Sequence, residues 1–299
     1  MRISSNNHLF NRETWTALGF LLPLAVFVVI FILVPVLGTL VDSFFLDVTY
    51  RPQRFLGAGN FIWLFNDPGF WRALRFTGLF VLVSVPLEMI LGLIIALVLN
   101  ERLPLRGLMR AAVLIPWAIP AVVSGRIFEL IYNYSYGAAN YLLAALRLTQ
   151  GPVNWLGTDI GAFLALVAAD SWKTTPFAAI ILLAGLSAIP PDLYRQAQVD
   201  RANFVQRFFR ITLPLLKPVL LVALLFRTIE ALRVFDLIFV LTGGGPGGAT
   251  TSVSLFSYNY FSAGDFGYGS AASVILFFIA LGLSLGLVRL GGVAEGVMP

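Results

Sequence analysis

The chain has 299 residues, of which 59% are hydrophobic and only 12% are charged, and its formal net charge is +5. Soluble domains carry about 25% charged residues, and a mean hydropathy of +0.87 argues against a soluble protein because so much apolar surface needs lipid around it. The absence of cysteine excludes disulfides, thiolate metal sites and cysteine nucleophiles, and the single histidine, His8, is not expected to be catalytic.

Six apolar runs are each long enough to cross a bilayer as a helix. In chain order they cover residues 15–40, 76–100, 108–132, 160–189, 215–241 and 268–290. The first belongs to an uncharged stretch about twice as long as the apolar region of a signal peptide, so it is predicted to be a retained span. The alternating segments of a β-barrel are absent. An all-α membrane protein with a single transmembrane domain over residues 1–299 is therefore expected.

Two segments outside these spans have patterns of their own. Residues 61–76 mix aromatic and charged side chains, which favours a helix lying at the membrane surface. Residues 243–248 read Gly-Gly-Gly-Pro-Gly-Gly and are predicted to form a flexible turn after the fifth span. They are not predicted to bind phosphate, because no Lys-Ser/Thr follows them and no strand precedes them.

The distribution of basic residues predicts the orientation in the membrane. Lys and Arg are scattered between apolar runs, which a membrane explains better than nucleic acid does. One set of loops contains eleven of them and the other set contains five. Because cytoplasmic loops are the more basic ones, both termini are expected in the cytoplasm.

The loop at residues 190–214, between the fourth and fifth spans, is predicted to form a short helix, a turn and a second helix. Apolar residues recur in it at helical spacing, and Asp192 is a plausible N-cap. One interpretation is an amphipathic connector lying on the membrane. The other is a docking element for a cytoplasmic partner, because a helical protrusion with charged and exposed apolar residues suits a groove in another protein.

Nine ionisable residues fall inside the predicted spans, where each costs about 2.5–3.5 kcal/mol: Glu88, Arg126, Glu129, Asp170, Lys173, Arg227, Glu230, Arg233 and Asp236. Eight of them form opposite-sign pairs three residues apart, which places the partners side by side on a helix. Glu88 is left over. The pairs either hold helices together or line a polar path for a hydroxyl-rich solute, since carboxylates and guanidinium groups bond hydroxyls well. The first reading is favoured for Arg126 and Glu129, and the second for the charges of the fourth and fifth spans.

The 190–214 loop resembles the coupling loop of ABC importer permeases. Its second half matches the family pattern as Ile211-Thr212-Leu213-Pro214, and Ala197, Asp200 and Ala202 also match. The first half departs from the pattern, because Arg195 stands at the usual Glu, Gln196 at an Ala and Arg201 at a Gly that usually permits the turn.

Further segments resemble the carbohydrate permeases of the maltose, trehalose and glycerol-phosphate type, and most of all their first permease subunit. They are residues 67–74, 115–120, 172–177, 186–190, 235–236 and 241–246. The resemblance covers nearly the whole chain. It implies the six-helix type I importer permease fold with a cytoplasmic coupling loop. The solute stays open between a trehalose- or maltose-like disaccharide, a glucosylglycerol-like osmolyte and glycerol phosphate, and the fourth and fifth spans look most like those of trehalose-type permeases.

The resemblance implies a permease that works by alternating access in a bacterial or archaeal plasma membrane. The expected partners are a second permease subunit, two copies of a cytoplasmic ABC ATPase and an extracytoplasmic sugar-binding protein. The chain itself is expected to be no enzyme and to bind no cofactor or metal, with ATP and Mg on the ATPase subunits. The rival hypotheses are an ion-coupled secondary sugar carrier, which usually needs an inverted repeat that is not detectable here, and an integral-membrane enzyme.

Two groups of site residues follow from this reading. The substrate path is expected to include Asp170, Trp172, Lys173, Thr174, Phe177, Arg227, Glu230, Arg233 and Asp236. The surface that contacts the ATPase is expected to include Arg195, Gln196, Ala197, Asp200, Arg201, Ala202, Phe208, Arg210, Leu213 and Pro214.

Overall fold

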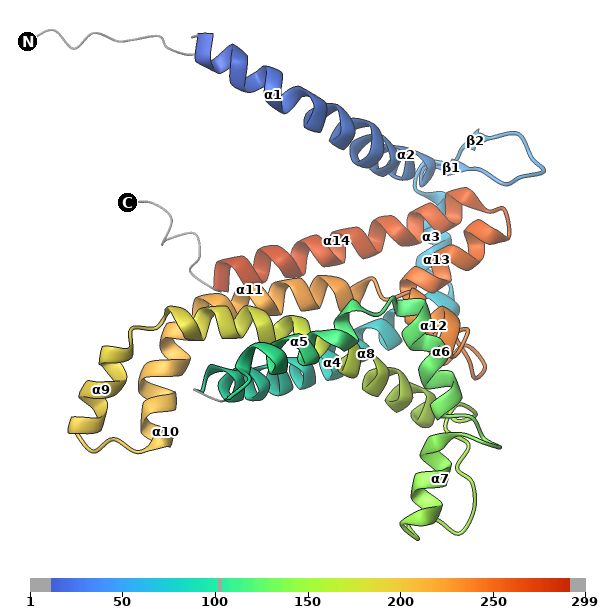
Figure 1. The fold of residues 1–299 in the computed structure, drawn as a ribbon. Helices are drawn as coiled ribbons and strands as arrows, with labels where there is room; N and C mark the ends of the chain where they lie inside the picture. The colour runs from blue at the N-terminus through green and yellow to red at the C-terminus, as the bar shows by residue number, and fades with distance from the viewer. Residues whose placement is uncertain (1–11, 102–103, 291–299) are drawn as a thin grey trace, which may run out of the picture.

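The computed structural model describes residues 12–101 and 104–290, and its long elements are all helices (Figure 1). Five described helices are long and apolar enough to cross a membrane, and a bent helix pair adds a sixth. The expectation of an all-helical membrane protein with about six spans is confirmed. His8 and Arg102 lie outside the described residues.

The N-terminal span stands away from the other helices. It consists of α1 (Arg12–Val28), the π-helical segment η1 (Val29–Leu33) and α2 (Val34–Asp42). None of its apolar window is buried, and only its α2 end approaches α14 (Phe266–Leu290) (Figure 1). Such an exposed apolar helix is stable where lipid or another subunit covers it.

A hairpin and a short helix lead from α2 to the second span. Strands β1 (Phe45–Leu46) and β2 (Arg54–Phe55) pair antiparallel, with Phe45 opposite Phe55, and α3 (Gly59–Phe65) follows. The second span, α4 (Pro68–Asn100), starts eight residues earlier than predicted because Asp67 caps it, its side chain accepting the Gly69 N–H at 2.6 Å. The prediction of a single surface helix over 61–76 is therefore wrong, because this segment contains the end of α3 and the start of α4.

The third span is broken rather than continuous. Helix α5 (Arg106–Ala118) and helix α6 (Ala121–Ile131) meet at an angle of 88°. The cause is Pro120, which lacks an N–H and excludes the helical conformation from Ile119, whose ψ is 131°. The prediction of one helix over 108–132 is wrong. Beyond α6 lies the short helix α7 (Ala138–Ala145).

The fourth span, α8 (Asp159–Ala188), is the most enclosed one, and it packs along α4. Their contact is close because Gly92 of α4 faces Ala178 and Ala179 of α8. Small residues let two helices approach in a membrane. The predicted span at 160–189 is confirmed, and this α4–α8 pair forms the centre of the apolar core.

The fifth span is displaced relative to the prediction of 215–241. Helix α9 (Pro191–Val199) and helix α10 (Phe204–Arg207) form the protruding loop, and the π-helical segment η2 (Phe208–Thr212) continues into α11 (Leu213–Leu232). Helix α11 ends at Leu232, and α12 (Asp236–Leu241) is a separate short helix. At the break, the Ser252 hydroxyl donates to the carbonyl of Val234 at 2.8 Å.

The turn after α12 connects to α13 (Val253–Ser262) and then α14. Gly243, Gly244, Gly247 and Gly248 all have positive φ, so the predicted glycine turn is present. It is also held in place, because the Thr250 hydroxyl donates to the Gly245 carbonyl at 2.6 Å. The hairpin, α7 and α12 lie at one end of the molecule and α9 and α10 at the other (Figure 1).

Candidate functional site: a buried ion cluster and a protruding loop

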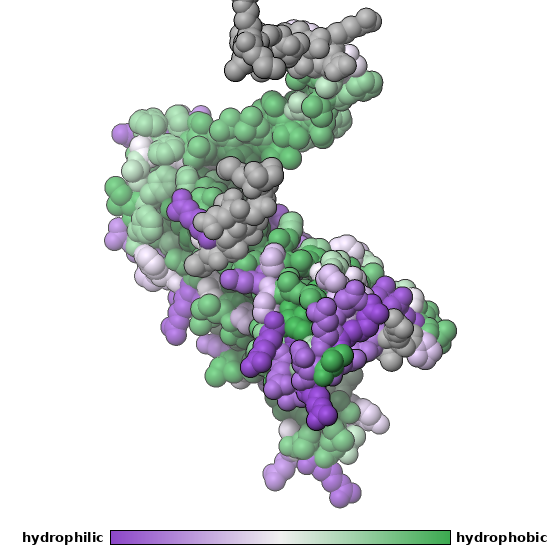
Figure 2. All heavy atoms as spheres, turned by 90° about the vertical axis from the view of Figure 1, so that its left-hand side faces the viewer, coloured by the Kyte–Doolittle hydropathy of each residue, from purple (hydrophilic) through white to green (hydrophobic). Residues whose placement is uncertain are grey.

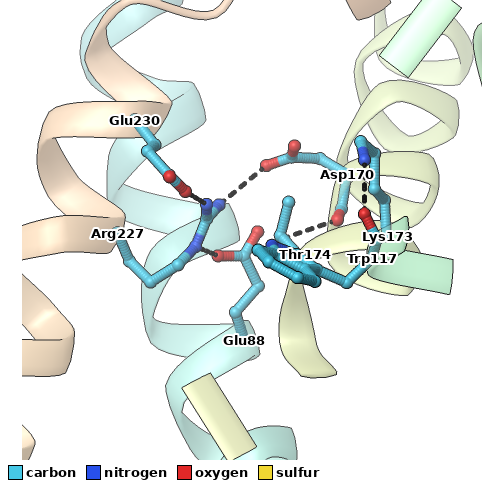
Figure 3. A network of polar contacts seen from close by, with 7 residues as sticks. All are labelled: Glu88, Trp117, Asp170, Lys173, Thr174, Arg227 and Glu230. Atoms are coloured by element: carbon cyan, nitrogen blue, oxygen red, sulfur yellow. Dashed lines mark hydrogen bonds and ion pairs between the residues drawn. The ribbon is translucent and has the colours of Figure 1, made fainter. Parts of the chain in front are cut away.

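Three helices bring three carboxylates around one buried guanidinium (Figure 3). Arg227 of α11 is 1% exposed. Its Nε donates to Glu88 of α4 at 2.6 Å, its Nη1 to Glu230 at 2.5 Å and its Nη2 to Asp170 of α8 at 3.3 Å. The fork of an arginine presents donors in several directions, so one side chain ties α4, α8 and α11 together.

Burial divides this cluster into an enclosed part and an exposed edge. Glu88 and Arg227 are almost fully enclosed, whereas the Glu230 side chain is 41% exposed. A buried charge that loses its partner costs about 3–5 kcal/mol. The inner part of the cluster therefore holds the helices in place, and Glu230 lies at its exposed edge.

Lys173 lies next to the cluster but binds elsewhere. Its Nζ donates to the carbonyl of Ile119 at 2.6 Å. It also donates to the carbonyl of Trp117 at 3.3 Å (Figure 3). These carbonyls belong to the broken end of α5, where backbone acceptors lack intrahelical partners, and a cation at a helix C-terminus is favourable. The predicted pairing of Lys173 with Asp170 is wrong, because Asp170 turns to Arg227.

An aromatic surface adjoins Lys173. The rings of Trp117 and Phe177 stack with their centroids 6.0 Å apart and 19° between their planes, and Phe226 meets Phe177 edge-on at 6.2 Å. Trp117 and Phe226 are about half exposed. Flat apolar rings beside charged hydrogen-bonding groups suit a solute that presents both C–H faces and hydroxyls.

The remaining predicted path residues do not join this cluster through any hydrogen bond or ion pair to its side chains. Thr174 is buried and donates to the backbone carbonyl of Asp170 at 2.7 Å. Trp172 packs against Phe128 of α6, with ring centroids 5.5 Å apart. Arg233 and Asp236 are exposed, and neither has an ion-pair partner in the described part of the chain.

The sequence pattern left three members of the site unassigned: Glu88, Trp117 and Phe226. Glu88 stood out only as the unpaired ninth charge, and the structure gives it Arg227 as a partner 139 residues away. Trp117 was not assigned to the path, because it enters the site only through the break at Pro120, and Phe226 was not assigned either, because only its contact with Phe177 places it there. The predicted pairs Arg126/Glu129 and Arg227/Glu230 are confirmed, whereas the pair Arg233/Asp236 does not form.

The second candidate site is the coupling loop (residues 190–214), which projects beyond the ends of the long helices (Figure 1). Hydrophilic atoms gather in the lower half of the face that Figure 2 presents, which is the end of the molecule with α9 and α10. Asp192 is not the predicted N-cap: it lies in the first turn of α9 and forms an ion pair with Arg195. Pro190 takes the cap position.

The turn of the coupling loop is well defined although it lacks the usual glycine. Arg201 adopts φ 56°, in the left-handed region, at the end of α9. The Ala202 N–H donates to the Ala197 carbonyl at 2.9 Å and the Arg201 N–H to the Gln198 carbonyl at 3.0 Å. This is the Schellman arrangement. Asn203 then caps α10 in a capping box with Gln206.

A hydrogen bond joins the two arms of the coupling loop. The hydroxyls of Tyr194 in α9 and Thr212 in η2 lie 2.9 Å apart, and Thr212 is 5% exposed.

The residues predicted to contact the ATPase fall into two groups, exposed and partly buried. Exposed are Arg195, Gln196, Asp200, Arg201, Arg210 and Pro214, and partly buried are Ala197, Ala202, Phe208 and Leu213.

The chain matches known proteins both in sequence and in structure. Residues 88–290 match the family described as "binding-protein-dependent transport system inner membrane component". The chain is 54% identical over 281 residues to the trehalose/maltose transport system permease protein MalF of Thermococcus litoralis, covering 94% of this chain and 95% of that protein. It is 41% identical over 264 residues to the sulfoquinovosyl glycerol permease SmoG of Agrobacterium fabrum, covering 87% and 85%.

A solved structure has the same fold. It is a bacterial alginate ABC transporter in complex with a periplasmic protein that carries an alginate pentasaccharide. The TM-score is 0.77 at 26% identity, and the match covers 93% of this chain and 94% of that chain.

Proposed function

This chain belongs to the family of binding-protein-dependent transport system inner membrane components, and we propose that it forms half of the membrane path of an ATP-driven sugar importer. The observation that carries the proposal is the position of the ion cluster. Asp170 lies on α8 and Arg227 on α11, the two spans that the coupling loop connects. A movement of that loop therefore reaches the polar groups along the path directly.

The solute is a disaccharide of the trehalose or maltose kind. Support comes from the 54% identity to a trehalose/maltose permease, and from an open edge that combines Glu230 and Lys173 with the aromatic surface of Trp117, Phe177 and Phe226. Carboxylates hydrogen-bond hydroxyls strongly. SmoG, which is 41% identical, belongs to a sulfoquinovosyl glycerol transport system, and the panel of sugars in the test below distinguishes the two kinds of solute.

The transport cycle is alternating access. A loaded sugar-binding protein delivers the solute to the outer end, and a second permease subunit completes the path across the face that bears Glu230. Two copies of a cytoplasmic ATPase contact the coupling loops and hydrolyse ATP. The chain acts in the plasma membrane with both termini in the cytoplasm, which the excess of basic residues in the loops at the α9–α10 end supports.

The test measures ATP hydrolysis by the chain in nanodiscs, first alone and then with the second permease, the ATPase and the binding protein. A panel of sugars is presented on the binding protein. We expect hydrolysis only in the full assembly, with stimulation by one loaded sugar. Sugar movement by the chain alone, driven by an ion gradient, would instead support a secondary carrier and refute this proposal.

A further inference from the structure

The ion cluster contains more carboxyl groups than cations. Among the described residues, Arg227 is the only cation within ion-pair distance of Glu88, Asp170 and Glu230. Lys173 follows Asp170 by less than one helical turn, but its Nζ donates to the carbonyls at the end of α5. If all three carboxyl groups were ionised, their negative charge would be only partly compensated inside the helix bundle, which is costly.

The helices packed against α8 bring no further cation to the cluster in the described ranges of the chain. Helices α4, α5, α6, α11 and α12 contact α8. Arg110 of α5 donates to the Leu99 carbonyl at 3.4 Å, and Arg126 of α6 pairs with Glu129. The remaining charged residues on α4, α11 and α12, and at the break after α11, are exposed: Arg72, Arg75, Lys217, Arg233 and Asp236.

The three carboxyl groups do not share the guanidinium equally. Glu88 and Glu230 accept from Arg227 at 2.6 Å and 2.5 Å, whereas Asp170 lies 3.3 Å from Nη2. The Glu230 side chain is 41% exposed, so its charge is also solvated, but that of Asp170 is only 10% exposed. Charge-assisted hydrogen bonds are normally short. Asp170 is therefore the carboxyl group whose negative charge would be compensated least.

Glu88 has one oxygen that lacks a hydrogen-bond donor. Its Oε2 accepts from Arg227, but its Oε1 is buried and finds no donor among the described residues. The carboxyl of Asp170 lies within hydrogen-bonding distance of the Glu88 carboxyl, and Figure 3 shows the free Glu88 oxygen on the side of Asp170. Two ionised carboxylates repel at this distance, whereas a protonated carboxyl offers the missing O–H donor.

We infer that the cluster binds a proton: Asp170 is a neutral carboxylic acid at pH 7, and its O–H donates to Oε1 of Glu88. The proton satisfies the orphaned oxygen and removes one negative charge from the enclosed part of the cluster. Glu88 and Arg227 then form a compensated buried pair, and the remaining negative charge lies at the exposed edge on Glu230. The inference stands on the geometry of the cluster and does not depend on the proposed function.

Infrared spectroscopy of the full chain in a detergent without carbonyl groups tests this proton directly. Protonated carboxyl groups have a C=O stretching band that carboxylates lack. All proteins carry Asp265→Asn, because the carboxyl of Asp265 also holds its proton more tightly than usual. At pH 7 we expect Asp170→Asn to lose one carboxylic acid band. Glu230→Gln and Asp159→Asn, at an exposed position on the same helix, should retain it.

Melting temperatures give a second measurement. The amide of Asp170→Asn can donate to Glu88 and accept from Arg227, so this variant should keep the melting temperature at pH 7. Asp170→Ala should lower it, because Oε1 of Glu88 loses its donor. Raising the pH removes the proton and adds a buried charge, so the melting temperature should fall more steeply in the chain with Asp170 than in Asp170→Asn.

Two infrared results would overturn the inference. One is a carboxylic acid band of unchanged intensity in Asp170→Asn. The other is independent of the folding of that variant: if ¹³C labelling of the aspartate side-chain carboxyl groups shifts no such band in the chain that keeps Asp170, then Asp170 is ionised. A shifted band that disappears at alkaline pH is the expected outcome.

Discussion

Glu88 and Arg227 are 139 residues apart in the chain, yet their side chains meet at 2.6 Å in the interior of the helix bundle. Neither side chain is more than 1% exposed. Because Asp170 and Glu230 also contact Arg227, removing the guanidinium leaves several carboxylates facing one another.

We therefore expect Arg227→Ala to be more destabilising than Glu88→Gln. Loss of the arginine should reduce the free energy of unfolding by about 3–5 kcal/mol, whereas the glutamine keeps a hydrogen-bond acceptor for Nε. Thermal unfolding in detergent measures both. Arg126→Ala is the control, since that ion pair is exposed and such pairs contribute about 0–1 kcal/mol. Equal effects of Arg126→Ala and Arg227→Ala would contradict this account of the cluster.

Lys173→Met should reduce sugar uptake more than it reduces stability. The substitution removes the donor to the Ile119 and Trp117 carbonyls, so the broken end of α5 and the Trp117 ring lose their fixed position. We expect at least a 10-fold lower uptake rate in proteoliposomes of the full transporter. Lys217→Met, on the exposed side of α11, should leave uptake unchanged. Normal uptake by Lys173→Met would show that Lys173 is not needed for sugar transport and would contradict its assignment to the substrate path.

Gly92→Val tests the close contact between α4 and α8. A Cβ at this position would come within 3.0 Å of the Ala178 Cβ and 3.1 Å of the Ala179 backbone nitrogen. Overpacking of this kind costs about 1–3 kcal/mol, and the melting temperature should fall. Gly78→Val on the same helix is the matched control, because nothing lies within 4 Å of its Cβ position. A similar shift for both variants would mean that helix propensity, and not packing, is responsible.

Tyr194→Phe removes the hydroxyl that joins the two arms of the coupling loop. Loss of such a hydrogen bond costs about 0.5–1.5 kcal/mol, and the arms should then move more independently. We expect a higher number of ATP molecules hydrolysed per sugar imported, measured by parallel hydrolysis and uptake assays. Tyr136→Phe, at an exposed position outside the coupling loop, should not change this ratio, and an unchanged ratio in Tyr194→Phe would show that the bond does not transmit motion.

The carboxyl of Asp265, which lies just outside the last span, should make the stability of the protein depend on pH. Burial raises the pKa of its carboxyl above the ordinary value, and the nearby Asp47 raises this pKa further. The folded protein therefore holds this proton more tightly than the unfolded chain, so stability from this group falls as pH rises from about 4 through the raised pKa. Asp265→Asn retains an acceptor for the Tyr268 N–H and should raise the melting temperature at pH 7. A lower melting temperature there would contradict this sign.

The sequence was most informative where a single helix is apolar and uninterrupted. The prediction of 160–189 agrees closely with α8, and that of 268–290 with α14. The broken third span was missed because apolar composition does not reveal a bend, although Pro120 was the local signal. The end of α11 at Leu232 was missed for a different reason: the break depends on a hydrogen bond from Ser252, which is distant in sequence.

Ion pairs were also predicted correctly where both partners are close in sequence, and incorrectly where a partner lies on another helix. Partners three residues apart on one helix were predicted correctly at Arg126 and Arg227. The spacing of charges along one helix does not show which charged side chains on other helices lie nearby. For this reason the sequence paired Asp170 with Lys173, its neighbour on the same helix. The packing of α4, α8 and α11 gives Asp170 to Arg227 and leaves Lys173 to the α5 carbonyls.

The segment η2 continues directly into α11, so a tilt at the loop end of this helix displaces residues farther along it. Arg227 lies fourteen residues beyond Leu213, which at about 1.5 Å per residue is about 21 Å. A tilt of about 10° at the loop end would therefore displace the guanidinium by about 4 Å relative to α4. A displacement of this size, directed away from α4, would break the 2.6 Å contact with Glu88, so we expect the free energy of this buried ion pair to oppose rotation of α11.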